Sequence, residues 1–296
     1  MRMNNTTNDT YITNTTQFTK NQPVSYKEAN QKTKHIKPII FMDVDDVVID
    51  THQTIIDILN SRFGLGFVIE DVKEWGFDRI LDRLNQAIKS DTVLQDKITE
   101  ESYHTPLTVE YIIHIFDSGE FWDKISFKKY AEIMLNNLYH RYDIIFISQG
   151  TNTNLTHKEN WLSLFAPCEF EFLRVGYHES KSTVIEKKIN KIVMELIERG
   201  VKTEVINSLF TVQVDDKYSN LEGICNLKIL LKNNRATYFN QIEDNTREDL
   251  YVMNDLKDIE TTLKFYSQYD YETLMELFPQ KKNFIDFIHN IVRNIF

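Results

Sequence analysis

The chain has 296 residues with 34 basic and 44 acidic side chains, which gives a formal net charge of −10. General binding to nucleic acid or to an anionic membrane is not expected, because both partners need a basic surface. A hydrophobic share of 42% is enough for a packed core, and 8 Gly and 5 Pro exclude collagen-like and Pro/Gly-rich low-complexity chains.

The cysteine content and the apolar runs indicate the compartment. Cys168 and Cys225 are too few for a disulfide framework or a Cys-rich zinc site, and they are typical of a reducing environment. The N-terminus lacks an apolar signal core, and no run approaches the roughly 18 apolar residues of a transmembrane helix. These features predict a soluble, cytoplasmic protein without a membrane partner, and the Asn/Lys/Ile-rich composition is compatible with a virus-encoded one.

Polar sequence comes first along the chain, and short apolar runs follow it. Residues 1–37 are rich in Asn, Thr and Gln, which predicts a disordered or loosely attached tail. Continuous apolar runs, without alternation, are typical of parallel strands that are covered on both faces. Four such runs occur, at residues 38–42, 143–147, 209–214 and 227–231.

The segments between these runs have mainly helical periodicity. The predicted helices span residues 51–63, 79–89, 106–116, 127–140, 181–200, 247–267 and 271–294. Because the span from 52 to 125 is too long for a simple crossover, we expect an inserted, mostly helical subdomain there. The prediction is an α/β core at 38–51 and 126–242, a helical insertion at 52–125 and a helical C-terminal extension at 243–296.

Polar residues follow three of the predicted strands. Asp43 and Asp45 follow the first, Ser148 and Gly150 with Gln149 follow the second, and an Asp-Asp pair follows the third, namely Asp215 and Asp216. Ligands of open parallel sheets bind beyond the carboxyl ends of the strands, so these side chains should form one site. One carboxylate could attack phosphorus while another moves a proton, and a divalent cation such as Mg²⁺ would offset the repulsion of an anionic substrate.

Three further groups of residues each allow a functional and a structural interpretation. A serine hydroxyl with backbone N–H groups, as at Ser148, can hold phosphate oxygens, but Ser-x-Gly is also an ordinary turn. Lys181 opens a predicted helix and could neutralise charge in a transition state, or it could be a solvated lysine with Lys187, Lys188 or Lys191 in that role. The aromatic side chains of the insertion could stack on a base or form its core. These aromatics are Trp75, Phe77, Phe121 and Trp122.

Taken in order, Asp43-x-Asp45, Ser148, Lys181 and Asp215-Asp216 resemble the four motifs of the haloacid dehalogenase superfamily. The resemblance implies a Rossmann-like core, a helical cap inserted between Asp45 and Ser148, and magnesium-dependent phosphotransferase chemistry. It also implies roles. Asp43 would be the nucleophile, and Asp45 would be the general acid/base and a metal ligand through its backbone carbonyl. Ser148 would bind the phosphoryl group, Lys181 would stabilise it, and the Asp-Asp pair would hold Mg²⁺.

Within that superfamily the chain looks most like the 5′(3′)-deoxyribonucleotidases. The sequence segments that show this similarity are residues 43–48, 74–77, 119–122 and 214–221. The similarity as a whole covers about residues 38–242. The chain departs from the pattern where Asp46 replaces the usual Gly, at Ser148-Gln149-Gly150, and in the long segment between Lys181 and Asp215.

The function that this likeness implies is hydrolysis of nucleoside monophosphates under the cap, with Trp75, Phe77, Gln149 and Gly150 binding the substrate. One alternative is a phosphatase for sugar phosphates or nucleic-acid 3′-phosphate ends. Another is a binding or regulatory protein that has lost turnover. A homodimer is also left open.

Overall fold

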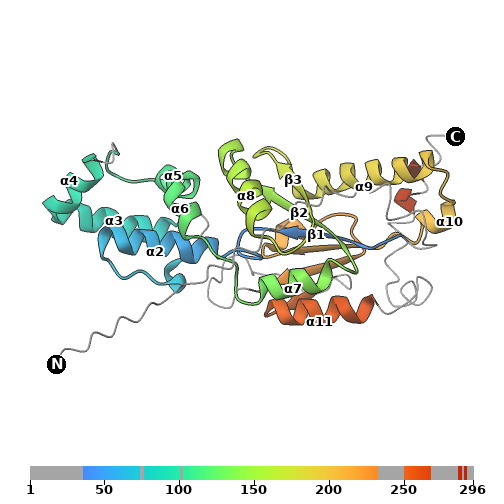
Figure 1. Cartoon of the computed structure of the whole chain (residues 1–296). Helices are drawn as coiled ribbons and strands as arrows, with labels where there is room; N and C mark the ends of the chain where they lie inside the picture. Colours follow the sequence, from blue (N-terminus) through green and yellow to red (C-terminus); the bar gives the residue numbers. More distant parts are fainter. Residues whose placement is uncertain are drawn as a thin grey trace, which may run out of the picture. The chain divides into compact units, whose positions relative to one another are not determined.

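The computed structural model describes residues 36–73, 77–100, 103–232, 250–267, 286–288 and 290–291 (Figure 1). Within these ranges the strands form one parallel sheet with the order β3-β2-β1-β4-β5-β6. The strands are β1 (Ile39–Asp43), β2 (Asp143–Gln149), β3 (Glu171–Val175), β4 (Thr211–Asp215), β5 (Leu227–Leu231) and β6 (Leu250–Met253). The predicted α/β fold with a parallel sheet is confirmed.

The segment between β1 and β2 is mostly helical, and helices also follow the later strands (Figure 1). In that segment lie α2 (Thr51–Phe63), the 3₁₀ turn η1 (Ile69–Asp71), α3 (Asp78–Ser90), α4 (Thr92–Glu100), α5 (Val109–Asp117), α6 (Gly119–Lys124) and α7 (Ala131–Leu138). After β2 come α8 (Asn152–Phe165), α9 (Lys181–Glu198), α10 (Thr203–Ile206), η2 (Tyr218–Leu221) and α11 (Leu256–Tyr266). Among the described residues, none of these helices is long and apolar enough to cross a bilayer.

The central strand β1 is buried over its whole length, and its side chains alternate between the two faces of the sheet. Ile39 and Phe41 belong to the hydrophobic cluster that includes α9, whereas Ile40 and Met42 belong to the cluster that includes α7, α8 and α11. Figure 1 shows α9 on one side of the sheet and α7 with α11 on the other. A strand covered on both faces requires the uninterrupted apolar run that the sequence contains.

The register of the sheet brings three polar strand ends to the same edge. Asp43 is opposite Ile147 of β2, one residue before Ser148, and Met42 is opposite Val214 of β4, one residue before Asp215. Because the strands are parallel, their carboxyl ends lie side by side, as the sequence analysis expects.

Several elements differ from the predictions. The strand β6 lies inside the range 247–267 that was predicted to be helical, so that prediction is wrong for residues 250–253. The helix α11 begins only after Asp255, whose side chain accepts a hydrogen bond from the backbone N–H of Asp258 and caps it. Neither β3 nor α8 was predicted. The sequence does not indicate β3 because the exposed residues Glu171 and Arg174 interrupt its apolar run.

Two predicted segments lie largely outside the described residues. The first is the predicted tail at 1–37, of which only residues 36 and 37 are described. The second is the predicted helix at 271–294, of which residues 286–288 and 290–291 are described, and these are helical.

Candidate active site

Three carboxylates meet at the carboxyl edge of the sheet. Asp43 ends β1, Asp215 ends β4, and Asp216 is the next residue. One oxygen from each lies within 4.8 Å of the others, and all three side chains are buried. Such a cluster of hard oxygen atoms is the donor set that Mg²⁺ prefers in proteins.

Lys181 supplies a positive charge to this cluster. It is the first residue of α9 and is buried, and its Nζ lies 2.7 Å from Asp43 Oδ2 and 2.7 Å from Asp215 Oδ2. The side chain of Asp43 continues the alternation that points Phe41 toward α9, which explains why the helix begins against it. The alternatives lie elsewhere, because Lys187 pairs with Glu179, Lys188 pairs with Glu171, and Lys191 is exposed.

The two members of the Asp-Asp pair differ in their surroundings. Asp215 Oδ2 accepts from Lys181, while its Oδ1 accepts from the backbone N–H of Lys217 at 2.9 Å and from Asn220 Nδ2 at 3.0 Å. Asp216 lines the adjacent cavity. Both oxygens of Asp215 are therefore engaged by the chain, and Asp216 is the member of the pair that faces the cavity.

Burial and crowding of like charges perturb these groups. Burial, with the neighbouring charges of Asp215 and Asp45, raises the pKa of Asp43 to about 7 in spite of Lys181. Burial also raises the pKa of Asp216 well above its ordinary value, with Asp215 and Asp43 adding to the effect. Burial alone would lower the pKa of Lys181, but Asp215 and Asp43 hold it above its ordinary value. The cluster carries more negative charge than Lys181 offsets.

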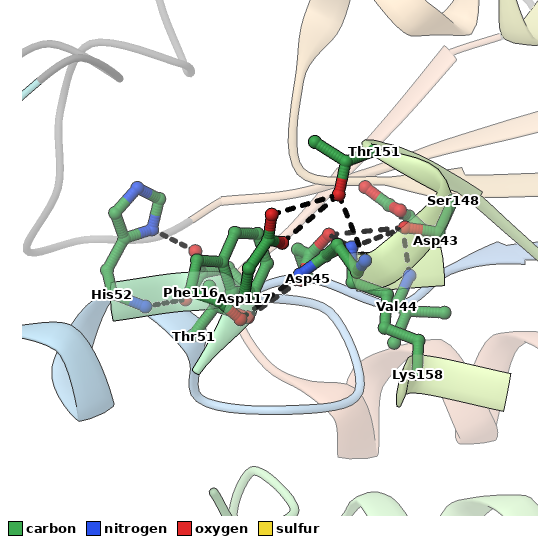
Figure 2. A network of polar contacts seen from close by, with 12 residues as sticks. Asp43, Val44, Asp45, Thr51, His52, Phe116, Asp117, Ser148, Thr151 and Lys158 are labelled. Atoms are coloured by element: carbon green, nitrogen blue, oxygen red, sulfur yellow. Dashed lines mark hydrogen bonds and ion pairs between the residues drawn. The ribbon is translucent and has the colours of Figure 1, made fainter. Parts of the chain in front are cut away.

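Asp45 lies beside this cluster and contacts a different set of donors (Figure 2). Its Oδ1 accepts a hydrogen bond from Thr51 Oγ1 at 2.9 Å. Its Oδ2 accepts from Ser148 Oγ at 3.2 Å and forms an ion pair with Lys158. Lys158 is wholly buried and also donates to Ser148 Oγ at 2.8 Å.

Lys158 was missed in the sequence analysis because α8 was not predicted. The available signal is a helical stripe of buried positions in which Lys158 stands between Leu155 and Leu162. A lysine in the middle of an apolar stripe is unusual, since burying an ammonium group requires a partner.

The cavity next to the cluster has a volume of about 110 Å³. Asp43, Asp45, Gln149, Lys181 and Asp216 line its polar side. The helical insertion supplies its apolar side, through Ile55, Phe77, Ile112, Ile113 and Phe116.

The remaining predicted site residues lie in several places. Ser148 and Gly150 are not among the residues that line the cavity, and Trp75 lies outside the described residues. Phe121 and Trp122 are buried and pack against each other, with ring centroids 5.0 Å apart.

The predicted turn after β2 is tied to the neighbouring loop. Gln149 Nε2 donates to the backbone carbonyls of Gly176 at 3.2 Å and Glu179 at 3.1 Å, which connects β2 to the segment that leads into Lys181. At Gly150, a Cβ atom would lie 3.0 Å from Asn154 Oδ1, so the start of α8 approaches this turn closely.

Asp46, which replaces the usual Gly, has its own buried partner. Its φ is +53°, in the left-handed region that a Gly would adopt without strain. Its carboxylate accepts from the backbone N–H of His52 at 3.3 Å and pairs with His52 Nδ1. Burial alone would raise the pKa of Asp46, but the His52 side chain holds this pKa below its ordinary value. His52 in turn stacks on Phe77 at the cavity wall.

The raised pKa values predict a pH-dependent response to Mg²⁺. Unfolded Asp ionises near its ordinary pKa, so above that pH folded Asp43 and Asp216 hold more protons than the unfolded chain. Their contribution to the free energy of unfolding therefore falls as the pH rises from about 5 to about 8. Mg²⁺ needs the ionised carboxylates, so it should raise the melting temperature more at the higher pH. At 100 times its Kd, a bound ion adds about 2.7 kcal/mol to the free energy of unfolding.

Thermal unfolding at both pH values, with EDTA or with Mg²⁺, checks this expectation. Asp216→Asn is the matched control, because it should weaken both the pH dependence and the Mg²⁺ effect. An equal Mg²⁺ effect at the two pH values would contradict the prediction.

Comparisons with known proteins gave structural matches only. No protein-family model matches the sequence, and no curated protein matches it. A solved structure of a haloacid dehalogenase-like hydrolase from Burkholderia xenovorans LB400 is 14% identical, with a TM-score of 0.42, over 76% of this chain and 96% of its own. A structure assigned as a phosphoglycolate phosphatase from Lactobacillus delbrueckii subsp. bulgaricus is 16% identical, with a TM-score of 0.45, over 77% and 98%.

A magnesium-bound HAD-hydrolase from Bacillus subtilis is 11% identical, with a TM-score of 0.43, over 77% of this chain and 99% of its own. All three TM-scores lie below 0.5.

Proposed function

We propose that the protein is a magnesium-dependent phosphomonoesterase of the haloacid dehalogenase superfamily that acts on (deoxy)ribonucleoside monophosphates. The observation that carries the proposal is the convergence of Asp43, Lys181, Asp215 and Asp216 at one sheet edge, with Asp45 beside them. These are the residues that the resemblance names for this chemistry. A protein that only binds a ligand has no need for so many converging carboxylates.

The carboxylate cluster fits Mg²⁺. Its oxygens are hard ligands within 4.8 Å of one another, and its charge exceeds what Lys181 offsets. Asp43 and Asp216 would hold the ion, with the backbone carbonyl of Asp45, while Asp215 would keep Lys181 in place. When bound, Mg²⁺ would neutralise the charge of the phosphoryl group and orient it.

In the proposed reaction, an Asp43 oxygen attacks phosphorus and forms an aspartyl-phosphate. The bond from phosphorus to the ribose oxygen breaks, and its electron pair leaves with that oxygen, which takes a proton from Asp45. Asp45 then removes a proton from a water molecule, whose oxygen attacks phosphorus. The bond to Asp43 breaks, releasing phosphate. Lys181 would offset the charge of the phosphoryl group. Ser148, which does not line the cavity and donates to Asp45, would act through that carboxylate.

The cavity supports a substrate with one phosphate and an apolar or planar remainder. Lys181 and Lys217 are its two ammonium groups among the described lining residues, and carboxylates outnumber them. A nucleobase would lie against the apolar side, where Phe77 and Phe116 line the wall. The small cavity volume favours a sugar phosphate as the second candidate.

Release of inorganic phosphate from a substrate panel tests the proposal. The panel contains deoxy- and ribonucleoside 5′- and 3′-monophosphates, sugar phosphates and 4-nitrophenyl phosphate, each with Mg²⁺ or with EDTA. We expect Mg²⁺-dependent release, fastest from a nucleoside monophosphate. Asp43→Asn, purified in parallel, measures any contaminating phosphatase.

The alternatives give different results in this assay. Faster release from sugar phosphates would contradict the nucleotide assignment and keep the phosphatase. No release from any substrate would contradict both.

A further inference from the structure

Lys158 is a buried cation that the proposed reaction does not use. Its side chain is wholly buried in α8, and it is not among the residues that line the cavity. Its Nζ pairs with Asp45 Oδ2 and donates to Ser148 Oγ at 2.8 Å. Removing a lysine from water costs more free energy than packing an apolar side chain of similar size. A purely structural role in α8 would be filled better by Met.

The contacts of Asp45 show what this cation does. Thr51 donates to one carboxylate oxygen, while Ser148 and Lys158 contact the other (Figure 2). The hydroxyls of Thr51 and Ser148 can rotate to other acceptors, and only Lys158 brings a full charge. The direction of the Asp45 carboxylate therefore depends chiefly on Lys158.

Lys158 also touches the helical insertion. Its Nζ lies 4.8 Å from the ring centroid of Phe116, near the end of α5. Two side chains at the start of α8 hold this end of α5. Thr151 Oγ1 donates to the Asp117 carboxylate, 3.1 Å from each oxygen, and Asn154 Nδ2 donates to the Phe116 carbonyl at 3.3 Å. A cation over an aromatic face is held there by the ring quadrupole. The insertion thus helps to fix the ammonium group.

We propose that Lys158 is the positioning residue for Asp45. Lys158 holds the Asp45 carboxylate at the edge of the cavity, where the proton for the leaving oxygen is needed. Because Phe116 of α5 contacts the Lys158 ammonium group, this placement also depends on the position of α5. The inference rests on the proposed phosphatase function, in which Asp45 is the general acid/base.

The test compares substrates whose leaving oxygens differ in their need for a proton. The leaving oxygen of 4-nitrophenyl phosphate departs with little help, whereas a ribose or other alkyl oxygen requires a proton. The comparison uses kcat/KM, which reports only the steps up to departure of the leaving oxygen and not the later hydrolysis of the aspartyl-phosphate. For Lys158→Met we expect kcat/KM to fall about 10²-fold on the alkyl substrate and less than about 10-fold on the aryl one. Lys158→Arg should retain part of the activity that Lys158→Met loses on the alkyl substrate. Phe116→Leu should also slow the alkyl substrate more than the aryl one, by a smaller factor than Lys158→Met.

A matched control and a double variant separate positioning from general damage. Lys188→Met removes another ion-paired lysine, one that contacts Glu171 away from the site, and should leave both rates unchanged. Asp45→Asn should show the same substrate difference, and adding Lys158→Met to it should cost little more. Equal loss on both substrates, or additive losses in the double variant, would overturn the role of Lys158.

A second measurement needs no substrate. In urea denaturation, Lys158→Met should lower the urea concentration at the unfolding midpoint when Asp45 is present. In the Asp45→Asn background, the same substitution should shift this midpoint less or not at all. Equal shifts in the two backgrounds would overturn the inference even if the wild type hydrolysed nothing. Absence of wild-type turnover on either substrate would overturn the proposed function instead, so the two failures are distinguishable.

Discussion

Asp43→Asn should abolish phosphate release and, at the same time, make the protein more stable. Removing a nucleophile that forms a covalent intermediate lowers kcat by at least about 10³-fold. Stability should change in the opposite direction, because burial raises the pKa of Asp43 to about 7 and its ionised form is therefore unfavourable in the folded state. Asn has a similar shape and no charge. We expect a gain of about 2 kcal/mol in the free energy of unfolding near pH 8.

Chemical denaturation in metal-free buffer, together with the phosphate assay, measures both effects. Asp96→Asn changes an exposed carboxylate of α4 and is the matched control, with both quantities near the wild-type values. An Asp43→Asn protein that kept its activity would remove Asp43 from the nucleophile role. A protein that lost stability would show that the ion pair with Lys181 outweighs the crowding of carboxylates.

Lys181→Met should have the opposite effect on stability. It leaves Asp43, Asp215 and Asp216 buried without the ammonium group that lies 2.7 Å from two of them. Removing one partner of a buried ion pair costs about 3–5 kcal/mol, because the remaining charge stays uncompensated. Mg²⁺ should recover part of this loss by supplying positive charge. Activity should fall by about 10²–10³-fold, since Lys181 would offset charge in the transition state.

Lys187→Met is the control for this change. Lys187 lies in the same helix and pairs on the surface with Glu179, and such pairs contribute at most about 1 kcal/mol. Urea denaturation of both variants, with EDTA and with Mg²⁺, gives the comparison. If Lys181→Met were as stable as Lys187→Met without metal, Lys181 would not be the compensating charge of the cluster.

The part of the fold that positions the site could be predicted from the sequence, because its signals are local. An apolar run that ends at Asp43 indicates both a buried strand and a polar strand end. The same pattern recurs before Ser148 and before Asp215. Parallel pairing then brings the three ends together, which is what the register shows. The start of α9 at Lys181 could also be predicted, since Ser180 before it is a helix-capping residue.

Other parts of the site depend on contacts between distant residues, which no local pattern reveals. Lys158 lies 113 residues from Asp45 along the chain, on a helix that was not predicted. The pairing of Asp46 with His52 explains a departure from the family pattern, but neither residue alone predicts it. In the same way, the difference between Asp215 and Asp216 follows from the η2 segment, where Asn220 occupies an oxygen of Asp215.

The lysines that pair with Asp43 and Asp45 lie on helices whose apolar residues belong to different cores, and this has a consequence for how the protein tolerates sequence change. Asp43 pairs with Lys181 of α9, and the apolar residues of α9 belong to the core that contains Ile39 and Phe41. Asp45 meets the lysine of α8, whose Leu162 belongs to the core on the opposite face. The two carboxylates are thus buffered by separate hydrophobic cores. We expect a repacking substitution under one helix to disturb first the ion pair on that helix, so substitutions in the two cores can accumulate separately during evolution.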